Sequence, residues 1–317
     1  MSEELRIKIK NDYEKRARAG TVGLKVNLYT AVDVAALGAS ISAAQPQSVR
    51  LECLMVGDSI LSTHHGRNST RLRDEQDRQW AYDVLRSSVT EVSSAMKDTP
   101  TVADAYLMAD LPDGSLASQD RLIRASEGFL EAGADAVKLE VDGPLSLEGL
   151  STLASAGVPT FGHLGFTPQT ARLRRHGTTA AERQDLYRQA RTIRDAGACG
   201  LILEMIAPLA NAALSAPSPQ GLPCFSIFSG PTVPGGGLSV NAWDAVFRHP
   251  SGAPGFPPTA FLDAADYPDH YSREAVSQGL TNLVTLVDEG RFPTRKRSAD
   301  IEPEILEDPW QTARSHL

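Results

Sequence analysis

The sequence predicts an α/β protein built as a (β/α)8 TIM barrel. Eight short apolar runs are separated by stretches of helical character, and this alternation indicates parallel strands joined by right-handed helical crossovers. Eight repeats favour closure of the sheet into a barrel, with a doubly wound open sheet as the alternative. The first strand is not followed by the glycine-rich fingerprint of dinucleotide-binding sheets, which counts against that alternative.

The elements follow one another in regular order. Strands are expected at 24–29, 51–56, 104–109, 135–139, 158–161, 200–203, 224–228 and, more weakly, 237–240. Helices are expected at 74–95, 118–132, 146–156, 180–196 and 272–289, and the charged N-terminus is also helical in character. Ala-Gly-Ala or Ala-Gly-Val precedes three strands, at 132–134, 156–158 and 196–198. A glycine there takes the left-handed conformation that ends a helix, so these loops are assigned to the bottom of the barrel.

A single domain accounts for most of the 317 residues. We expect one barrel with an N-terminal and a C-terminal helix over residues 1–293, because α/β barrels commonly exceed 250 residues as one unit. Residues 249–270 are rich in proline and glycine and are expected to form an ordered surface excursion. The polar tail, 294–317, is expected to be partly mobile or to serve a subunit contact.

Composition excludes several classes of protein. The net charge of −8 comes without a basic stripe, which argues against a nucleic-acid partner. The N-terminus lacks the apolar core of a signal peptide, and no apolar run approaches the ~20 residues of a membrane span. We therefore expect a soluble, cytoplasmic protein with no membrane partner. The cysteines, Cys53, Cys199 and Cys224, form no CxxC pattern and are expected to be inert core thiols.

Five of the predicted strands end in ionisable side chains. These residues are Asp58, Asp110, Lys138 with Glu140, His163 and Glu204, and Ser59 follows Asp58 directly. The carboxyl ends of barrel strands converge on one pocket, so these groups should meet there. Any one carboxylate after a strand could instead be a helix N-cap, and a lone histidine is more often structural. Five such strand ends together favour a functional site.

This set of residues suits a divalent metal. Clustered carboxylates repel one another unless a cation lies among them, and oxygen ligands suit Mg²⁺ better than zinc. A metal chelated by a 2-oxo acid polarises the ketone and stabilises the enolate formed when C3 loses a proton. Lys138 is hard to explain as an unpaired buried lysine, and with Ser59 it could hold the substrate carboxylate. Glu204 or His163 could be the base.

Longer motifs surround these residues. They are TAVD at 30–33, VGDS at 56–59, DLP at 110–112, AVKLE at 136–140, GHLGFTPQ at 162–169, Glu204, GFPP at 255–258 and GRFP at 290–293. On these motifs the chain resembles the ketopantoate hydroxymethyltransferases, a (β/α)8-barrel family related to the phosphoenolpyruvate mutase and isocitrate lyase group. The motifs occur in family order from about residue 20 to 293.

The resemblance implies a role for each residue. Asp58 and Asp110 would bind Mg²⁺ or another divalent cation, with Glu140 among or just outside the metal ligands. Ser59 and Lys138 would grip the 2-oxo-acid carboxylate, and Glu204 would be the base at C3 with His163 beside it. The family transfers a one-carbon unit from methylenetetrahydrofolate to 2-oxoisovalerate in pantothenate biosynthesis and forms a homo-oligomer. The implied partners are therefore a small-molecule 2-oxo acid, methylenetetrahydrofolate and further copies of the chain.

The chain also departs from the family pattern. The family's tyrosine, phenylalanine and glycine positions carry Val32, Asp113 and Asp142, and an otherwise apolar loop carries His64 and His65. The glycine-rich IGIGAG segment becomes SIFSG at 226–230, and the DGQ after it is replaced around 235–237. If the three altered rim side chains point inward, they favour retained chemistry on an acid other than 2-oxoisovalerate.

Two other functions are weighed against transfer of a one-carbon unit. A lyase or mutase of the related group would carry a reactive cysteine on a loop after the fourth or fifth strand, and none of the three cysteines lies there. A non-catalytic relative would be free to lose its costly ionisable groups, whereas Asp58, Asp110, Glu140 and Glu204 are all present.

Overall fold

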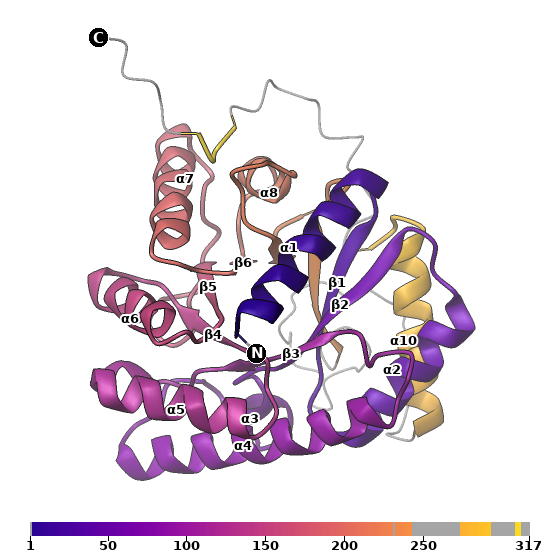
Figure 1. The fold of residues 1–317 in the computed structure, drawn as a ribbon, viewed down its shortest axis with the longest axis horizontal. Helices are drawn as coiled ribbons and strands as arrows, with labels where there is room; N and C mark the ends of the chain where they lie inside the picture. Colours follow the sequence, from indigo (N-terminus) through magenta and orange to yellow (C-terminus); the bar gives the residue numbers. More distant parts are fainter. Residues whose placement is uncertain (1, 231, 243–272, 293–307, 312–317) are drawn as a thin grey trace.

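Eight parallel strands form a closed barrel in the order β1 to β8 (Figure 1). The computed structural model describes residues 2–230, 232–242, 273–292 and 308–311. The strands are β1 (Val22–Asn27), β2 (Val49–Val56), β3 (Tyr106–Asp110), β4 (Ala136–Glu140), β5 (Thr160–Gly165), β6 (Gly200–Glu204), β7 (Cys224–Ile227) and β8 (Gly237–Asn241). The predicted barrel and its eight strands are confirmed, and the open sheet is excluded.

Helices surround the barrel (Figure 1). They are α1 (Ser2–Ala19), α2 (Ala31–Ala44), α3 (Ile60–Thr63), α4 (Glu75–Lys97), α5 (Gln119–Glu131), α6 (Pro144–Ser155), α7 (Ala180–Asp195), α8 (Pro208–Ser215) and α10 (Arg273–Asp288), with a 3-10 turn η1 (Ser115–Ala117) before α5. All five predicted inter-strand and C-terminal helices are present. The sequence did not reveal α2 and α8, because their many alanine and serine residues give no clear polar face.

Local signals explain where helices begin and end. Gly133, Gly157 and Gly197 have φ of 107°, 78° and 98°, the left-handed region expected for these helix-ending loops. At the start of α2, the Thr30 side chain accepts a hydrogen bond from Asp33 N, and the Asp33 carboxylate accepts one from Thr30 N. This capping box gives the motif at 30–33 a structural role in starting the helix.

Helix α1 covers the end of the barrel at which the strands begin. Its Leu5 and Ile9 pack with the residues that fill the barrel interior. Arg16 is buried there, donates to Gly235 O at 3.1 Å and forms a 2.6 Å ion pair with Glu52 on β2. The barrel is therefore closed below by α1, and the opposite end, where the strands finish, is left for a site.

Some predicted features fall outside the described residues. The excursion at 249–270, with its motif at 255–258, and most of the tail at 294–317 are among them, and the domain boundary at residue 293 stays a prediction. Residues 308–311 are described and lie against α7, where Arg191 donates to Pro309 O at 2.6 Å and Trp310 is buried. Within the described ranges, none of the helices has the length and apolarity needed to cross a membrane.

Candidate active site

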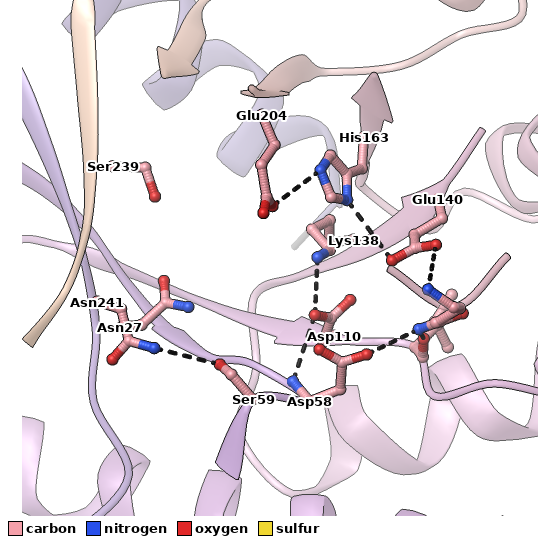
Figure 2. A network of polar contacts seen from close by, with 12 residues as sticks. Asn27, Asp58, Ser59, Asp110, Lys138, Glu140, His163, Glu204, Ser239 and Asn241 are labelled. Atoms are coloured by element: carbon pink, nitrogen blue, oxygen red, sulfur yellow. Dashed lines mark hydrogen bonds and ion pairs between the residues drawn. The ribbon is translucent and has the colours of Figure 1, made fainter. Parts of the chain in front are cut away.

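A cavity of about 500 Å³ opens where the strands end. Five of the residues predicted from strand ends line it, namely Asp58, Ser59, Asp110, Lys138 and Glu204. Figure 2 shows these side chains converging from β2, β3, β4 and β6. The structure therefore brings together most of the predicted site, whereas Glu140 and His163 lie behind the cavity wall.

Asp58, Asp110 and Lys138 form one buried charged group. Lys138 Nζ lies 2.8 Å from Asp110 Oδ2, and the backbone N of Asp58 donates to the same oxygen at 3.3 Å. Burial, followed by the negative charge of Asp110, raises the pKa of Asp58 to about 8. Burial alone would lower the pKa of Lys138, but the surrounding carboxylates outweigh it and raise that pKa, so Lys138 stays charged.

Gln169 connects the carboxylates to the loop after β5. Its backbone N donates to Glu140 Oε2 at 3.1 Å, and its Nε2 donates to Asp58 Oδ2 at 3.0 Å and to Leu111 O at 3.0 Å. Gln169 thereby bridges Glu140 and Asp58. Burial raises the pKa of Glu140 well above its usual value. Gln169 ends the GHLGFTPQ motif, but the motif alone did not indicate that it would bind a site carboxylate.

His163 was expected just after strand five, and this placement was wrong. It lies within β5 and is fully buried, because the sheet continues to Gly165. Its Nε2 lies 3.3 Å from Glu204 Oε2 and its Nδ1 lies 3.8 Å from Glu140 Oε1, but neither contact has hydrogen-bond geometry among the described residues. Burial, and then the charge of Lys138, lowers the pKa of His163 well below its usual value. The ring is therefore neutral, and its Nε2 faces Glu204, which lines the cavity.

Glu204 is the last residue of β6 and reaches the cavity wall. Burial raises the pKa of its carboxyl to about 7, although the positive charges of Lys138 and Lys25 act in the opposite direction. A carboxylate with a pKa near neutrality is a more effective proton acceptor at physiological pH than an ordinary glutamate. Its position and its pKa both suit a general base.

Strands β1 and β8 contribute polar residues that the sequence analysis missed. Lys25 Nζ donates to Asn27 Oδ1 at 2.5 Å and to Ser239 Oγ at 2.9 Å, and burial lowers the pKa of Lys25 to about 8. Asn241, the last residue of β8, donates to Ser59 Oγ at 3.4 Å. The period of two in each strand could have found these residues, because Lys25 and Asn27, like Ser239 and Asn241, share one face.

The altered rim residues do not face the cavity. Asp113 accepts a hydrogen bond from Leu72 N at 2.8 Å, and Asp142 accepts one from Ser146 Oγ at 2.9 Å at the start of α6. Val32 lies on α2 and is 38% exposed. None of the three lines the cavity, so the expectation that these side chains point inward was wrong. The carboxylates of Asp113 and Asp142 are satisfied by these local hydrogen bonds.

His64 and His65 pack against aromatic rings. The ring of His64 meets that of Tyr29 edge-on at 5.0 Å, and the ring of His65 meets that of Trp80 at 5.5 Å. Tyr29 in turn forms a 2.6 Å hydrogen bond with Ser59 Oγ. The histidine pair therefore supports the loop beside the cavity.

Two observations fit a divalent cation at Asp58 and Asp110. Asp110 Oδ1 is buried with no hydrogen-bond partner among the described residues, and the neighbouring Asp110 carboxylate raises the pKa of Asp58. Mg²⁺ is commonly held by one or two carboxylates, with water and substrate completing its ligands. Within the part of the chain that the structure describes, no three Asp, Glu, His or Cys side chains form a metal-binding group. Glu140 as a further ligand stays a prediction.

Comparison with known proteins assigns the family. The sequence profile of the ketopantoate hydroxymethyltransferases matches residues 23–295. The chain belongs to this family. Among ketopantoate hydroxymethyltransferase relatives, the 3-methyl-2-oxobutanoate hydroxymethyltransferase of Desulfotalea psychrophila is 30% identical over 280 residues, covering 86% of this chain and 88% of the relative. That of Carboxydothermus hydrogenoformans is 30% identical over 290 residues, covering 90% and 94%.

Solved structures agree on the fold of this hydroxymethyltransferase family member. An oxaloacetate acetylhydrolase in complex with oxalate superposes with a TM-score of 0.52 at 13% identity, covering 91% of this chain and 97% of that one. A protein from Burkholderia cenocepacia that is assigned as a phosphonomutase superposes with a TM-score of 0.51 at 16% identity, covering 77% of this chain and 93% of that one. These structures therefore support the barrel fold, and membership of the family makes the chain an enzyme of a one-carbon transferase family.

Proposed function

We propose that the chain uses a divalent cation, Mg²⁺ by preference, to enolise a 2-oxo acid at C3 and to add a one-carbon unit from methylenetetrahydrofolate. One observation carries this proposal. Asp58, Asp110, Lys138, Ser59 and Glu204 line a single cavity, so acid binding and proton removal can occur side by side. Membership of the hydroxymethyltransferase family supports the same reaction.

Lys138 and Ser59 would bind the substrate carboxylate. Lys138 is held charged by the carboxylates around it, and its ammonium group has three donors, of which Asp110 uses one. Ser59 is fixed by Tyr29 and Asn241, whose contacts with its Oγ are 2.6 Å and 3.4 Å long. A positioned charge and a positioned hydroxyl would hold the acid in one orientation, which lowers the entropic cost of reaching the transition state.

Asp58 and Asp110 would hold the cation. When bound, the cation would polarise the ketone and so acidify the C3 proton. Glu204 would accept that proton, because its pKa near 7 lets it be ionised at neutral pH and still gain from accepting a proton. His163 would limit the movement of the Glu204 carboxyl, since its neutral ring lies 3.3 Å from Glu204 Oε2.

The new bond would form between C3 and the one-carbon unit. Water would add to the methylene carbon of methylenetetrahydrofolate and break its two bonds to nitrogen, releasing tetrahydrofolate and formaldehyde. The electron pair left at C3 would attack the formaldehyde carbon, and the alkoxide formed would take up the proton held by Glu204. The product is a 2-oxo acid with a hydroxymethyl group at C3. Assembly of the chain into a homo-oligomer stays a prediction from the family resemblance.

The cysteines do not favour the lyase or mutase alternative. Cys53, Cys199 and Cys224 are all buried, as expected for core thiols, and none lines the cavity. Burial raises the pKa of Cys224 to about 12 and also raises the pKa of the other two thiols. Thiols of this kind are poor nucleophiles and poor acids near neutral pH.

The reaction can be tested by product analysis. The protein is incubated with Mg²⁺, methylenetetrahydrofolate and a panel of 2-oxo acids, and the products are separated by mass. We expect at least one acid to gain a hydroxymethyl group with release of one equivalent of tetrahydrofolate. Cleavage or rearrangement of an acid in samples without the folate would favour the lyase or mutase alternative instead.

A further inference from the structure

Two pairs of polar side chains lie side by side where β1 and β8, the first and last strands, meet to close the barrel. The strand register pairs Lys25 with Ser239 and Asn27 with Asn241, and all four side chains are at least nine-tenths buried. The interior of such barrels is usually filled by branched apolar residues, and buried polar groups are costly unless they are paired. These four residues therefore need a polar partner for each of their donors and acceptors.

Lys25 fixes the orientation of Asn27. A lysine ammonium group only donates, so the Asn27 amide must turn its oxygen toward Lys25, as the 2.5 Å contact shows. The Asn27 Nδ2 group then lies on the other side of the amide, and Asn27 lines the cavity. Among the described residues, no group accepts a hydrogen bond from Asn27 Nδ2. The Asn27 amide donor thus faces the cavity in which the substrate is expected.

Asn241 has a different task. Its Nδ2 donates to Tyr29 Oη at 3.2 Å and to Ser59 Oγ at 3.4 Å, so it fixes the serine proposed to bind the substrate carboxylate. Of the two asparagines on this wall, Asn27 is the one whose amide donor remains for a ligand.

The Asn27 donor lies opposite the charged group. Figure 2 shows Asn27 and Asn241 on one side of the site, and Asp58, Asp110 and Lys138 on the other. If an acid places its carboxylate between Lys138 and Ser59, its ketone at Asp58 and Asp110 and its C3 proton at Glu204, the remaining substituent on C3 is the part left to meet the Asn27 donor, which lines the same cavity. That substituent is the part of the acid that distinguishes one 2-oxo acid from another.

We infer that Asn27 selects a 2-oxo acid whose C3 substituent carries a hydrogen-bond-accepting oxygen. The inference rests on the proposed function for the identity of the acid. The names of the relatives refer to 3-methyl-2-oxobutanoate, whose branched alkyl group has no such oxygen. A purely apolar substituent would leave the Asn27 donor buried without a partner, and sites built to bind an oxygen reject analogues that lack it.

A matched pair of acids tests the inference. 4-Hydroxy-2-oxopentanoate and 4-methyl-2-oxopentanoate have the same number of non-hydrogen atoms and differ by a hydroxyl in place of a methyl group, and neither carries the hydroxymethyl group at C3 that the proposed reaction would add. Calorimetry with Mg²⁺ measures the affinity of each acid, and deuterium uptake at C3 in D₂O is recorded for the same samples. We expect the wild type to bind the hydroxy acid about tenfold or more tightly than the alkyl acid. Equal affinities, or tighter binding of the alkyl acid, would overturn the inference.

Two variants assign the preference to Asn27. Asn27→Leu should abolish or reverse it, whereas the control Asn68→Leu, which changes an exposed asparagine at the cavity rim, should keep it. Circular dichroism checks that both variants fold, and the wild-type ratio remains a test if Asn27→Leu does not. A preference that survives in folded Asn27→Leu would contradict the assignment. A preference in binding without C3 exchange of either acid would overturn the proposed function and leave the inference about Asn27 supported.

Discussion

Lys138 and Asp110 form a buried ion pair between neighbouring strands, with 2.8 Å between Nζ and Oδ2. The strand register places the two residues directly beside each other, Asp110 as the last residue of β3 and Lys138 two residues before the end of β4. The charge of Lys138 therefore serves two carboxylates, that of Asp110 within the protein and, in the proposed reaction, that of the substrate. Lys138 is a link between the proposed metal-binding and acid-binding parts of the site.

Lys138→Ala should raise the KM for the 2-oxo acid about ten- to a hundredfold, because a charge-assisted hydrogen bond to the carboxylate is lost. Steady-state kinetics with the best acid of the panel measures this. The exposed Lys97→Ala on α4 is the matched control and should leave KM unchanged. An unchanged KM in folded Lys138→Ala would make Lys138 a structural partner of Asp110 only.

Asp58→Asn should abolish binding of the divalent cation and enzyme activity while the fold is retained. The amide keeps the shape of the carboxyl but removes the charge that an oxygen-bound cation requires. Calorimetric titration with Mn²⁺ or Mg²⁺ measures the loss, and Asp142→Asn, which alters a carboxyl outside the cavity, is the control. Wild-type metal affinity in Asp58→Asn, or full activity in excess chelator, would remove the basis of the metal assignment.

Enolisation should depend on pH through Glu204. Its pKa is raised to about 7, and a base must be deprotonated to act, so the rate of C3 exchange should rise as the pH increases through about 7. His163 would not give this pH dependence, since its pKa is lowered well below its usual value and its ring stays neutral across this range. A rate independent of pH between 5.5 and 8 would contradict the role of Glu204.

The same shift links Glu204 to stability. The folded state holds the proton of the Glu204 carboxyl more tightly than the unfolded chain does. The protonated carboxyl therefore contributes to the free energy of unfolding. This contribution is fully present below pH 4.5 and is lost as the pH rises through about 7. Glu204→Gln should reduce this fall in the free energy of unfolding, as measured by urea denaturation at several pH values. An identical pH dependence in the wild type and in the variant would show that the carboxyl is not shifted.

At the other end of the barrel, Arg16→Met should destabilise the fold by about 3–5 kcal/mol, because it leaves the Glu52 carboxylate buried without its partner. Urea denaturation measures the change. The double variant Arg16→Met with Glu52→Gln should recover part of the loss, since it removes the unpaired charge as well. If Arg16 stabilised the fold only by packing on the rings of Tyr13 and Phe225, the double variant would recover none of the lost stability.

The sequence could predict the barrel because each strand is a short apolar run bounded by its own helix and turn signals. The sequence also predicted that Asp58, Asp110, Lys138 and Glu204 lie at one site, since this depends only on where strands end. It did not predict in which direction a side chain beyond the end of a strand points. Asp113 is adjacent to the site motifs in sequence, yet it binds a backbone amide outside the cavity.

The polar residues where β1 meets β8 were not predicted, for a different reason. Leu24, Val26 and Leu28 made the first strand read as one apolar run, and this concealed Lys25 and Asn27 between them. The pairing of Asn27 with Asn241 is a contact between the first and the last strand, and it exists only once the barrel closes. Local sequence patterns carry no signal for such a contact.

The central claim is that Glu204 removes the C3 proton of a metal-bound 2-oxo acid, and deuterium exchange at C3 tests it most directly. Wild type and Glu204→Gln are compared in D₂O with Mg²⁺ and the acid that binds best, and calorimetry confirms that both proteins bind acid and metal. We predict exchange by the wild type and none by Glu204→Gln, because the amide keeps the shape of the side chain but cannot accept a proton. Exchange by Glu204→Gln at the wild-type rate would contradict the account and make His163 the candidate base.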